Sequence, residues 1–140
     1  MTYWDTSALV ALYVGQVRSA EVRALAARPG RIVTWTVSEI EVRSALARLE
    51  REASVPADAL RQAREDASRH WESFAVIGTV DAVKTRARRL LGVHALRAAD
   101  ALQLAAALTA ASDDPTGHSL VTLDERLATA AGREGFTILP

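Results

Sequence analysis

Short runs of apolar, often β-branched residues alternate along the chain with longer segments in which apolar residues recur every three or four positions. The short runs are typical of buried strands and the longer segments of helices with one buried face. Strands that alternate with helices favour a parallel sheet covered on both faces, which is an α/β fold. We expect five strands, at Thr2–Asp5, Arg31–Trp35, Phe74–Ile77, Ser119–Thr122 and Phe136–Leu139.

About seven helices are expected between and after these strands. They are the segment up to Val14, Val17–Arg28, a segment capped by Thr36 or Ser38, a segment opened by Ser54 and Pro56, Asp81–Leu91, Ala98–Ala111 and Asp124–Ala131. Gly15 and Gly92 are expected to end two of them. Leu90 and Leu91 are both predicted to be buried, and the almost wholly apolar segment Ala98–Ala111 should be a largely buried helix.

The composition fits one domain that covers residues 1–140. With 140 residues, 49% of them hydrophobic, the chain can bury a core, and it contains neither a linker nor a repeat. It has no cysteine, which excludes disulfides and thiolate zinc sites and fits a reducing compartment. The first apolar run, Ala8–Val14, is too short for a secretion signal or a membrane span, so we expect a cytoplasmic protein without a membrane partner.

The charges give no indication of the substrate. Seventeen basic and seventeen acidic residues cancel, so no overall positive field points to a nucleic acid. Lys84 is the only lysine, and the many arginines offer planar donors suited to phosphates or to an acidic protein.

Three acidic residues are predicted to lie at one edge of the sheet. Asp5 and Asp124 each end or follow a strand and begin a helix, and Glu41 lies early in the helix after the second strand. Open parallel sheets bind ligands outside the carboxyl ends of their strands. Taken singly, however, Asp5 and Asp124 could be helix caps and Glu41 a surface residue.

Asp100 is a different case, because no strand directly precedes it. It lies in the first turn of a nearly all-apolar helix, where an ionised carboxylate needs a partner. Alternatively it is an acid that the helix dipole stabilises. Gln103 follows one turn later on the same face, and its amide could orient the Asp100 carboxylate or a bound water.

Four segments of the chain resemble motifs of the PIN-domain family, and most closely of its VapC-like members, the toxin ribonucleases of toxin-antitoxin pairs. They are D-T-S-A-L-V from Asp5, Glu41 with the following V-R-S-A-L, L-R-A-A-D-A-L-Q-L-A around Asp100, and L-V-T-L-D-E-R-L-A-T-A-A with Gly135. The four occur in the family's order and spacing and cover nearly the whole chain.

The resemblance implies a Rossmann-like, three-layer α/β/α sandwich with a five-stranded parallel sheet. It implies that Asp5, Glu41, Asp100 and Asp124 surround one or two Mg²⁺ or Mn²⁺ ions and hydrolyse RNA. Thr6, Ser7 and Thr122, beside these acids, are candidate helpers. The resemblance also implies a cognate antitoxin and a homodimer.

One position of the chain departs from the family pattern, and another is ambiguous. Many relatives carry histidine where this chain has Gln103, which argues against basic catalysis there. Glu39 is a rival for Glu41, and choosing it would move the acid by about 200° around the helix. We prefer Glu41, because V-R-S-A-L follows it directly.

The donors also limit the metal and the substrate contacts. Carboxylates suit Mg²⁺ or Mn²⁺ rather than zinc, and the three histidines are isolated in sequence. Backbone phosphates could be bound by Arg97, the first candidate because it lies three residues before Asp100, or by Arg43, Arg86, Arg88 and Arg89. Salt bridges on solvated helix faces would explain most of these arginines equally well.

Other small α/β proteins fit less well. A signalling receiver domain needs an acidic pair after its first strand and a lysine after its last, whereas Lys84 lies in a middle helix. A phosphatase with a D-x-D motif would need an acid where Ser7 stands. A PIN-fold binding module without nuclease activity, and a chromosomal PIN nuclease of RNA processing without an antitoxin, remain as alternatives.

Overall fold

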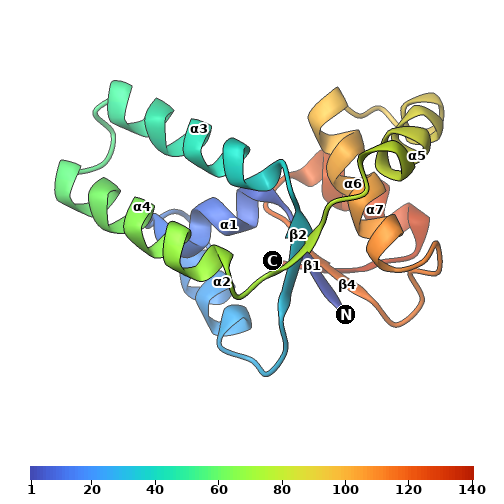
Figure 1. Ribbon diagram of the computed structural model, residues 1–140, viewed down its shortest axis with the longest axis horizontal. Coiled ribbons are helices and arrows are strands. Elements are labelled where there is room, and N and C mark those ends of the chain that lie inside the picture. Colours follow the sequence, from blue (N-terminus) through green and yellow to red (C-terminus); the bar gives the residue numbers. More distant parts are fainter.

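A computed structural model describes all residues 1–140 and contains one five-stranded sheet between two layers of helices (Figure 1). All strand pairs are parallel, and the strand order is β3-β2-β1-β4-β5. The strands are β1 (Thr2–Trp4), β2 (Ile32–Trp35), β3 (Ala75–Ile77), β4 (Ser119–Val121) and β5 (Thr137–Leu139). The predicted α/β sandwich is confirmed.

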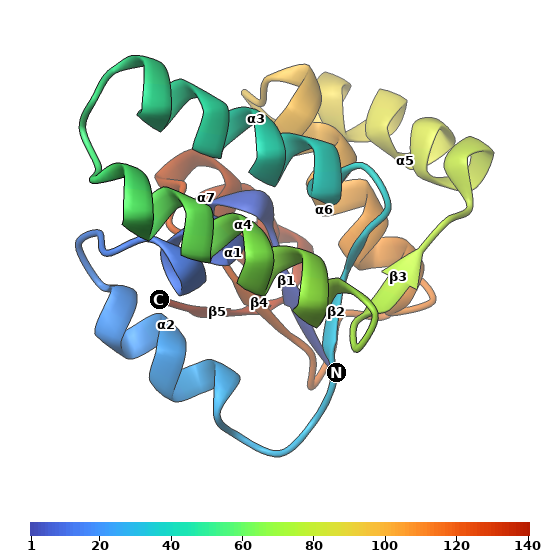
Figure 2. The ribbon, with the colours of Figure 1, turned by 60° about the vertical axis from the view of Figure 1, so that its left-hand side comes forward.

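The helices divide between the two faces of the sheet. One layer holds α1 (Thr6–Tyr13), α2 (Ser19–Ala26), α3 (Ser38–Arg51) and α4 (Ala57–Trp71). The other holds α5 (Val80–Val93), α6 (Ala98–Ala110) and α7 (Glu125–Glu134). Figures 1 and 2 show these layers on opposite sides of the strands.

Each face of the sheet has its own core, because successive residues of a strand point to opposite sides. Tyr3 and Leu120 pack in the core under α5, α6 and α7, whereas their neighbours Trp4 and Val121 pack in the core under α1 to α4. The predicted burial of the Ala98–Ala111 segment is confirmed, since Ala101 and residues 103–108 of α6 are all buried. No helix combines the length and the apolar character needed to cross a bilayer.

The strand order places the sequence's first and fourth strands side by side at the centre of the sheet. Trp4 pairs with Val121, and the backbone N–H of Asp5 donates to the Val121 carbonyl at 3.2 Å. The chain leaves β1 and β4 toward opposite helical layers, which makes this junction a topological switch point. Residues that follow these two strands therefore lie next to each other.

The fifth helix differs from its prediction in two ways. Gly92 does not end it, since the helix continues to Val93 and the His94 N–H still donates to the Leu90 carbonyl at 2.8 Å. Leu91 is not buried but 47% exposed, because it lies about 100° around the helix from Leu90 and outside the stripe formed by Val83, Ala87 and Leu90.

Other helix ends also differ from the prediction. Neither Thr36 nor Ser38 caps α3, whose N-cap is Val37 without a side-chain bond. The Thr36 N–H is used by the sheet, donating to the Ile77 carbonyl at 3.0 Å. The seventh helix runs past Ala131 and ends at Gly135, whose φ of 109° is accessible to glycine but costly for other residues.

Neighbouring leucines of α5 provide a test of this packing. We predict that Leu90→Ala lowers the free energy of unfolding by about 2–5 kcal/mol, because it opens a cavity in the core. Leu91→Ala, at an exposed position, should change it by less than about 0.5 kcal/mol. Urea denaturation of both variants measures the difference, and equal losses would contradict this packing of α5.

Candidate functional site

All four acids singled out in the sequence line one open cavity of about 650 Å³ at the carboxyl edge of the sheet. Asp5 and Asp124 are the N-cap residues of α1 and α7; Asp5 directly follows β1, and Asp124 lies three residues after the end of β4. Glu41 lies in the first turn of α3 and Asp100 in the first turn of α6. Since α6 returns the chain to the start of β4, its N-terminus lies at this same edge.

Asp5 is the most buried of the four, with only 4% of its surface exposed. Its Oδ1 accepts hydrogen bonds from the Ala8 N–H at 3.0 Å and from the Ser7 hydroxyl at 2.7 Å. These bonds favour the ionised form, but the loss of solvent outweighs them. Burial therefore raises the pKa of Asp5 from its ordinary value of 3.8 to about 6.

A buried amide orients Glu41. The Nε2 group of Gln103 lies within hydrogen-bond distance of Glu41 Oε2 at 2.5 Å, Thr6 Oγ1 at 2.9 Å and Ser38 Oγ at 3.0 Å. The Thr6 hydroxyl donates to the same Glu41 oxygen, and the Tyr3 hydroxyl donates to Gln103 Oε1 at 2.7 Å. Gln103 is 3% exposed, so the amide that orients the Glu41 carboxylate is itself shielded from solvent.

Gln103 therefore forms no hydrogen bond with Asp100, which was one of the two roles expected for its amide. Asp100 instead accepts a hydrogen bond from the Arg97 backbone N–H at 3.3 Å, which ties it to the start of its own helix. The Gln103 side chain turns toward β1 and α3, where buried Tyr3 and Ser38 supply partners for both ends of the amide. The helical spacing predicted that Asp100 and Gln103 share a face of α6, but it could not predict which residues the Gln103 amide contacts.

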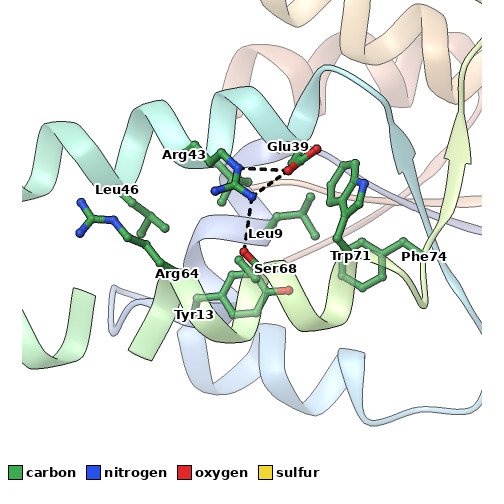
Figure 3. A pocket seen from close by; sticks show the side chains of 11 residues that line it. Leu9, Tyr13, Glu39, Arg43, Leu46, Arg64, Ser68, Trp71 and Phe74 are labelled. Atoms are coloured by element: carbon green, nitrogen blue, oxygen red, sulfur yellow. Dashed lines mark hydrogen bonds and ion pairs between the residues drawn. The ribbon is translucent and has the colours of Figure 1, made fainter. Parts of the chain in front are cut away.

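Glu39, the rival of Glu41, lies on another side of α3. It accepts hydrogen bonds from Arg43 at 2.9 and 3.1 Å, and Arg43 also contacts Ser68 of α4 (Figure 3). These residues line a small, mostly apolar hollow between α1, α3 and α4, away from the four acids. The structure thus places Glu41, and not Glu39, on the acidic cavity.

Hydroxyl groups link the ends of β1 and β4. The Ser7 hydroxyl lies 3.3 Å from Thr122 Oγ1 and accepts the Leu123 N–H at 2.8 Å. Thr122 Oγ1 accepts the Asp124 N–H at 3.0 Å, and Asp124 Oδ1 accepts two N–H groups of α7, at 2.8 and 3.0 Å. Of the predicted helpers, Thr6 and Ser7 line the cavity, whereas Thr122 supports it from a buried position.

None of the four acids forms an ion pair with a lysine, arginine or histidine; the ion pairs of the chain join other residues. Three of them also leave one oxygen without a protein donor: Glu41 Oε1, Asp100 Oδ1 and Asp124 Oδ2. The negative charge of these carboxylates is left uncompensated by the protein, and a divalent cation would compensate it.

The donor set fits Mg²⁺ or Mn²⁺ rather than a softer metal, because it consists of carboxylate and hydroxyl oxygens. No three acidic or histidine side chains form a ready-made metal-binding group, however. An ion enclosed directly by all four acids would need their side chains to move closer together. Mg²⁺ commonly keeps several waters and uses one or two carboxylates, which suits a wide cavity of this kind.

Sequence reasoning missed the two cations on the cavity, Arg48 and Arg51 of α3. The arginines it named instead lie elsewhere: Arg43, Arg86 and Arg89 pair with Glu39, Asp113 and Glu134, and Arg88 and Arg97 are exposed and do not line the cavity. Helical spacing could have found Arg48, because it lies seven residues, about two turns, after Glu41 and so on the same face.

A parallel sheet that gathers four carboxylates at its carboxyl edge, two after β1 and β4 and two in the first turns of α3 and α6, has the architecture implied by the sequence motifs. The chain belongs to the PIN domain family, whose pattern matches residues 2–133. It is 32% identical to Ribonuclease VapC45 of Mycobacterium tuberculosis, over 100% of this chain and 95% of that protein.

Solved structures share the fold at lower sequence identity. A toxin–antitoxin complex from Klebsiella pneumoniae contains a chain with a TM-score of 0.66 and 17% identity, covering 100% of this chain and 97% of the other. VapC20 of Mycobacterium tuberculosis, described as a sarcin-ricin loop cleaving toxin, has a TM-score of 0.66 and 20% identity over 98% of this chain and 97% of its own. Both likenesses extend over the whole sheet and its helices.

The effect of the uncompensated Asp5 charge on stability can be measured. Its pKa is higher in the folded chain than in the unfolded one, so ionisation destabilises the fold as pH rises from about 4 through about 6, by about 3 kcal/mol at neutral pH. In the presence of a chelator, Asp5→Asn should therefore be more stable than the wild type at pH 8 by up to this amount. Its advantage should shrink toward pH 4.

Urea denaturation across this pH range measures the difference, with Asp81→Asn as the control. Asp81 is an exposed acid in the first turn of α5, and its substitution should change stability by less than about 0.5 kcal/mol. A loss of stability in Asp5→Asn at pH 8 would contradict a charged, uncompensated carboxylate at this position.

Proposed function

We propose that this protein is a metal-dependent endoribonuclease that hydrolyses RNA phosphodiester bonds and acts as the toxin of a toxin-antitoxin pair. The observation that carries the proposal is the group of four carboxylates without counterions on one cavity. Its chemical meaning comes from the resemblance over the whole chain to a protein named Ribonuclease VapC45. Residues 1–140 would act as one PIN-like domain.

Asp5, Glu41, Asp100 and Asp124 would hold Mg²⁺ or Mn²⁺ in this cavity. The cation supplies Lewis acidity, which polarises a phosphate and lowers the pKa of water. The chain's own part is to hold the carboxylates in position on the cavity. Ser7 and the start of α1 orient Asp5, Thr6 and Gln103 orient Glu41, and the start of α7 orients Asp124.

Hydrolysis also requires a proton acceptor and a defined position for the phosphate. Glu41, Asp100 and Asp124 each have a carboxylate oxygen that no protein group occupies, and such an oxygen can accept a proton from the attacking water. Because the cavity is open, a phosphodiester within a longer strand can reach these oxygens without a free end. This geometry favours cleavage inside an RNA chain.

A protein inhibitor and a second copy of the chain are the partners that fit this proposal. The fold is shared with a chain of a toxin–antitoxin complex, which supports an antitoxin as a partner of this protein too. Homodimerisation is a further part of the proposal and rests on the family resemblance alone. Size-exclusion chromatography with light scattering would test it.

Two glutamates of α3 test the catalytic assignment. We predict that the wild type cleaves single-stranded RNA with Mg²⁺ or Mn²⁺ and stops when a chelator is added. Glu41→Gln should reduce the rate by more than about 100-fold, because it removes a charge from the candidate metal site. Glu39→Gln, two residues away and outside the cavity, should retain most of the activity. Intact RNA after incubation with the metal-loaded wild type would favour the binding-module alternative.

Metal binding can be tested without activity. We predict that millimolar Mg²⁺ or Mn²⁺ raises the melting temperature of the wild type, because the cation binds only the folded arrangement of acids. Asp100→Asn should show a smaller rise. Differential scanning fluorimetry measures both, and identical melting curves with and without the cations would argue against a metal site here.

A further inference from the structure

We infer that Arg48 and Arg51 form a phosphate-binding surface that holds the RNA backbone beside the four acids. The inference rests on the proposed function and adds to it the residues that bind the substrate on one side of the reacting phosphate. Both arginines line the acidic cavity, and they are the only cations among its 16 lining residues.

The two arginines lie on the same side of α3 as Glu41. Glu41, Ser44, Ala45, Arg48 and Arg51 follow one another at intervals of three or four residues or less, and all five line the cavity. With a rise of 1.5 Å per residue, the backbone of Arg48 lies about 10 Å along the helix from that of Glu41, and Arg51 about 15 Å. The helix thus presents an acid at its start and two cations toward its end.

Neither arginine is held by a strong ion pair. Arg51 has no acidic partner within 4.0 Å, and Arg48 reaches Glu52 only at 4.0 Å, with both side chains more than half exposed. By contrast, Arg43 and Arg64 of the same region form pairs of 2.9 and 2.5 Å. Arg48 and Arg51 are therefore available to an anion from solution, and arginine binds phosphate oxygens through two parallel N–H bonds.

The cavity offers few other means of holding a nucleic acid. No aromatic side chain lines it, so bases cannot stack there as they do in many single-strand binding sites. Most of the affinity should therefore come from the backbone phosphates, which arginines bind without regard to sequence.

The opposite end of the cavity carries no comparable positive charge. Beyond Asp124 it continues into a hollow of about 600 Å³ that shares Gln16, Leu123 and Asp124 with it. The one cation there, Arg18, pairs with Glu21 at 3.2 Å and faces a hollow that also contains Glu125. Within these two hollows, cations without a strong ion pair therefore lie only on the α3 side of the acids.

The test compares two double variants that each lose two positive charges. Arg48→Ala with Arg51→Ala removes the phosphate-binding surface. Lys84→Ala with Arg88→Ala removes two exposed cations four residues apart on α5, which has no residue on the cavity. The probe is a fluorescently labelled single-stranded RNA of mixed sequence, used for steady-state cleavage with Mg²⁺. Binding is measured with the same RNA in the Asp5→Asn background.

We expect the α3 double variant to raise KM about tenfold or more, with kcat changed by less than about threefold, because it removes binding common to ground and transition states. The slope of log affinity against log salt should flatten by about 1.4, since each single-strand phosphate contact contributes about 0.7. The α5 control should leave KM and the slope as in the wild type. Arg48→Lys with Arg51→Lys should recover most of the slope, because the charge is kept.

The outcomes separate this inference from the proposed function. If the wild type cleaves RNA and the α3 double variant keeps its KM and salt slope, the phosphate-binding surface is wrong and the nuclease proposal stands. If the wild type cleaves no RNA in the presence of Mg²⁺, the nuclease proposal itself is wrong. Unchanged RNA affinity together with lost affinity for the cognate antitoxin would assign the two arginines to protein recognition and overturn the inference.

Discussion

The gathering of four carboxylates without counterions on one cavity is the constraint on which the rest of this structure depends. The strand order brings Asp5 and Asp124 together at the centre of the sheet, and α3 and α6 add Glu41 and Asp100 to the same cavity. Burial holds the pKa of Asp5 near 6, so its ionised form at neutral pH opposes folding. The two cores on either side of the sheet must offset that cost, and the charge they hold in place is what makes the cavity attractive to a divalent cation.

The surroundings of the acids orient them without neutralising them. Glu41 is held by the Gln103 amide and the Thr6 hydroxyl, and Asp5 and Asp124 by backbone N–H groups at helix starts. An arginine in the place of Gln103 would fix Glu41 as firmly but would cancel its charge. Tyr3 completes the arrangement by donating to the carbonyl end of the amide, and burial with the nearby Asp5 and Glu41 charges raises the pKa of Tyr3, which keeps it a donor. Neutral donors thus give geometric precision while the net negative charge remains.

The elements of this fold could be predicted because their patterns are local. Strands such as Ser119–Val121 are short apolar runs, and Asp5 and Asp124 stand where a strand gives way to a helix, which also fixes their edge of the sheet. Leu91 could not be placed by its apolar character alone, since only the angular position around α5 separates it from Leu90. The partners of Gln103 were beyond prediction for another reason. They come from Tyr3, Thr6 and Ser38, which are distant in sequence and become neighbours only through the tertiary packing of β1, α3 and α6.

Charge pairing explains why a neutral composition is compatible with the proposed site for an anionic substrate. Most of the ion pairs join arginines to acids on exposed helix surfaces, for example Arg61 with Asp58 and Arg69 with Asp66, and such pairs cancel within a few ångströms. Among the charges outside these pairs, those on the cavity form a local separation of charge, with the acids at one end and Arg48 and Arg51 toward the other. A polyanion approaching this cavity meets attraction from the arginines and repulsion from the acids. A divalent cation bound by the acids would replace their repulsion of the polyanion with attraction. Binding of the metal and binding of the nucleic acid should therefore favour each other.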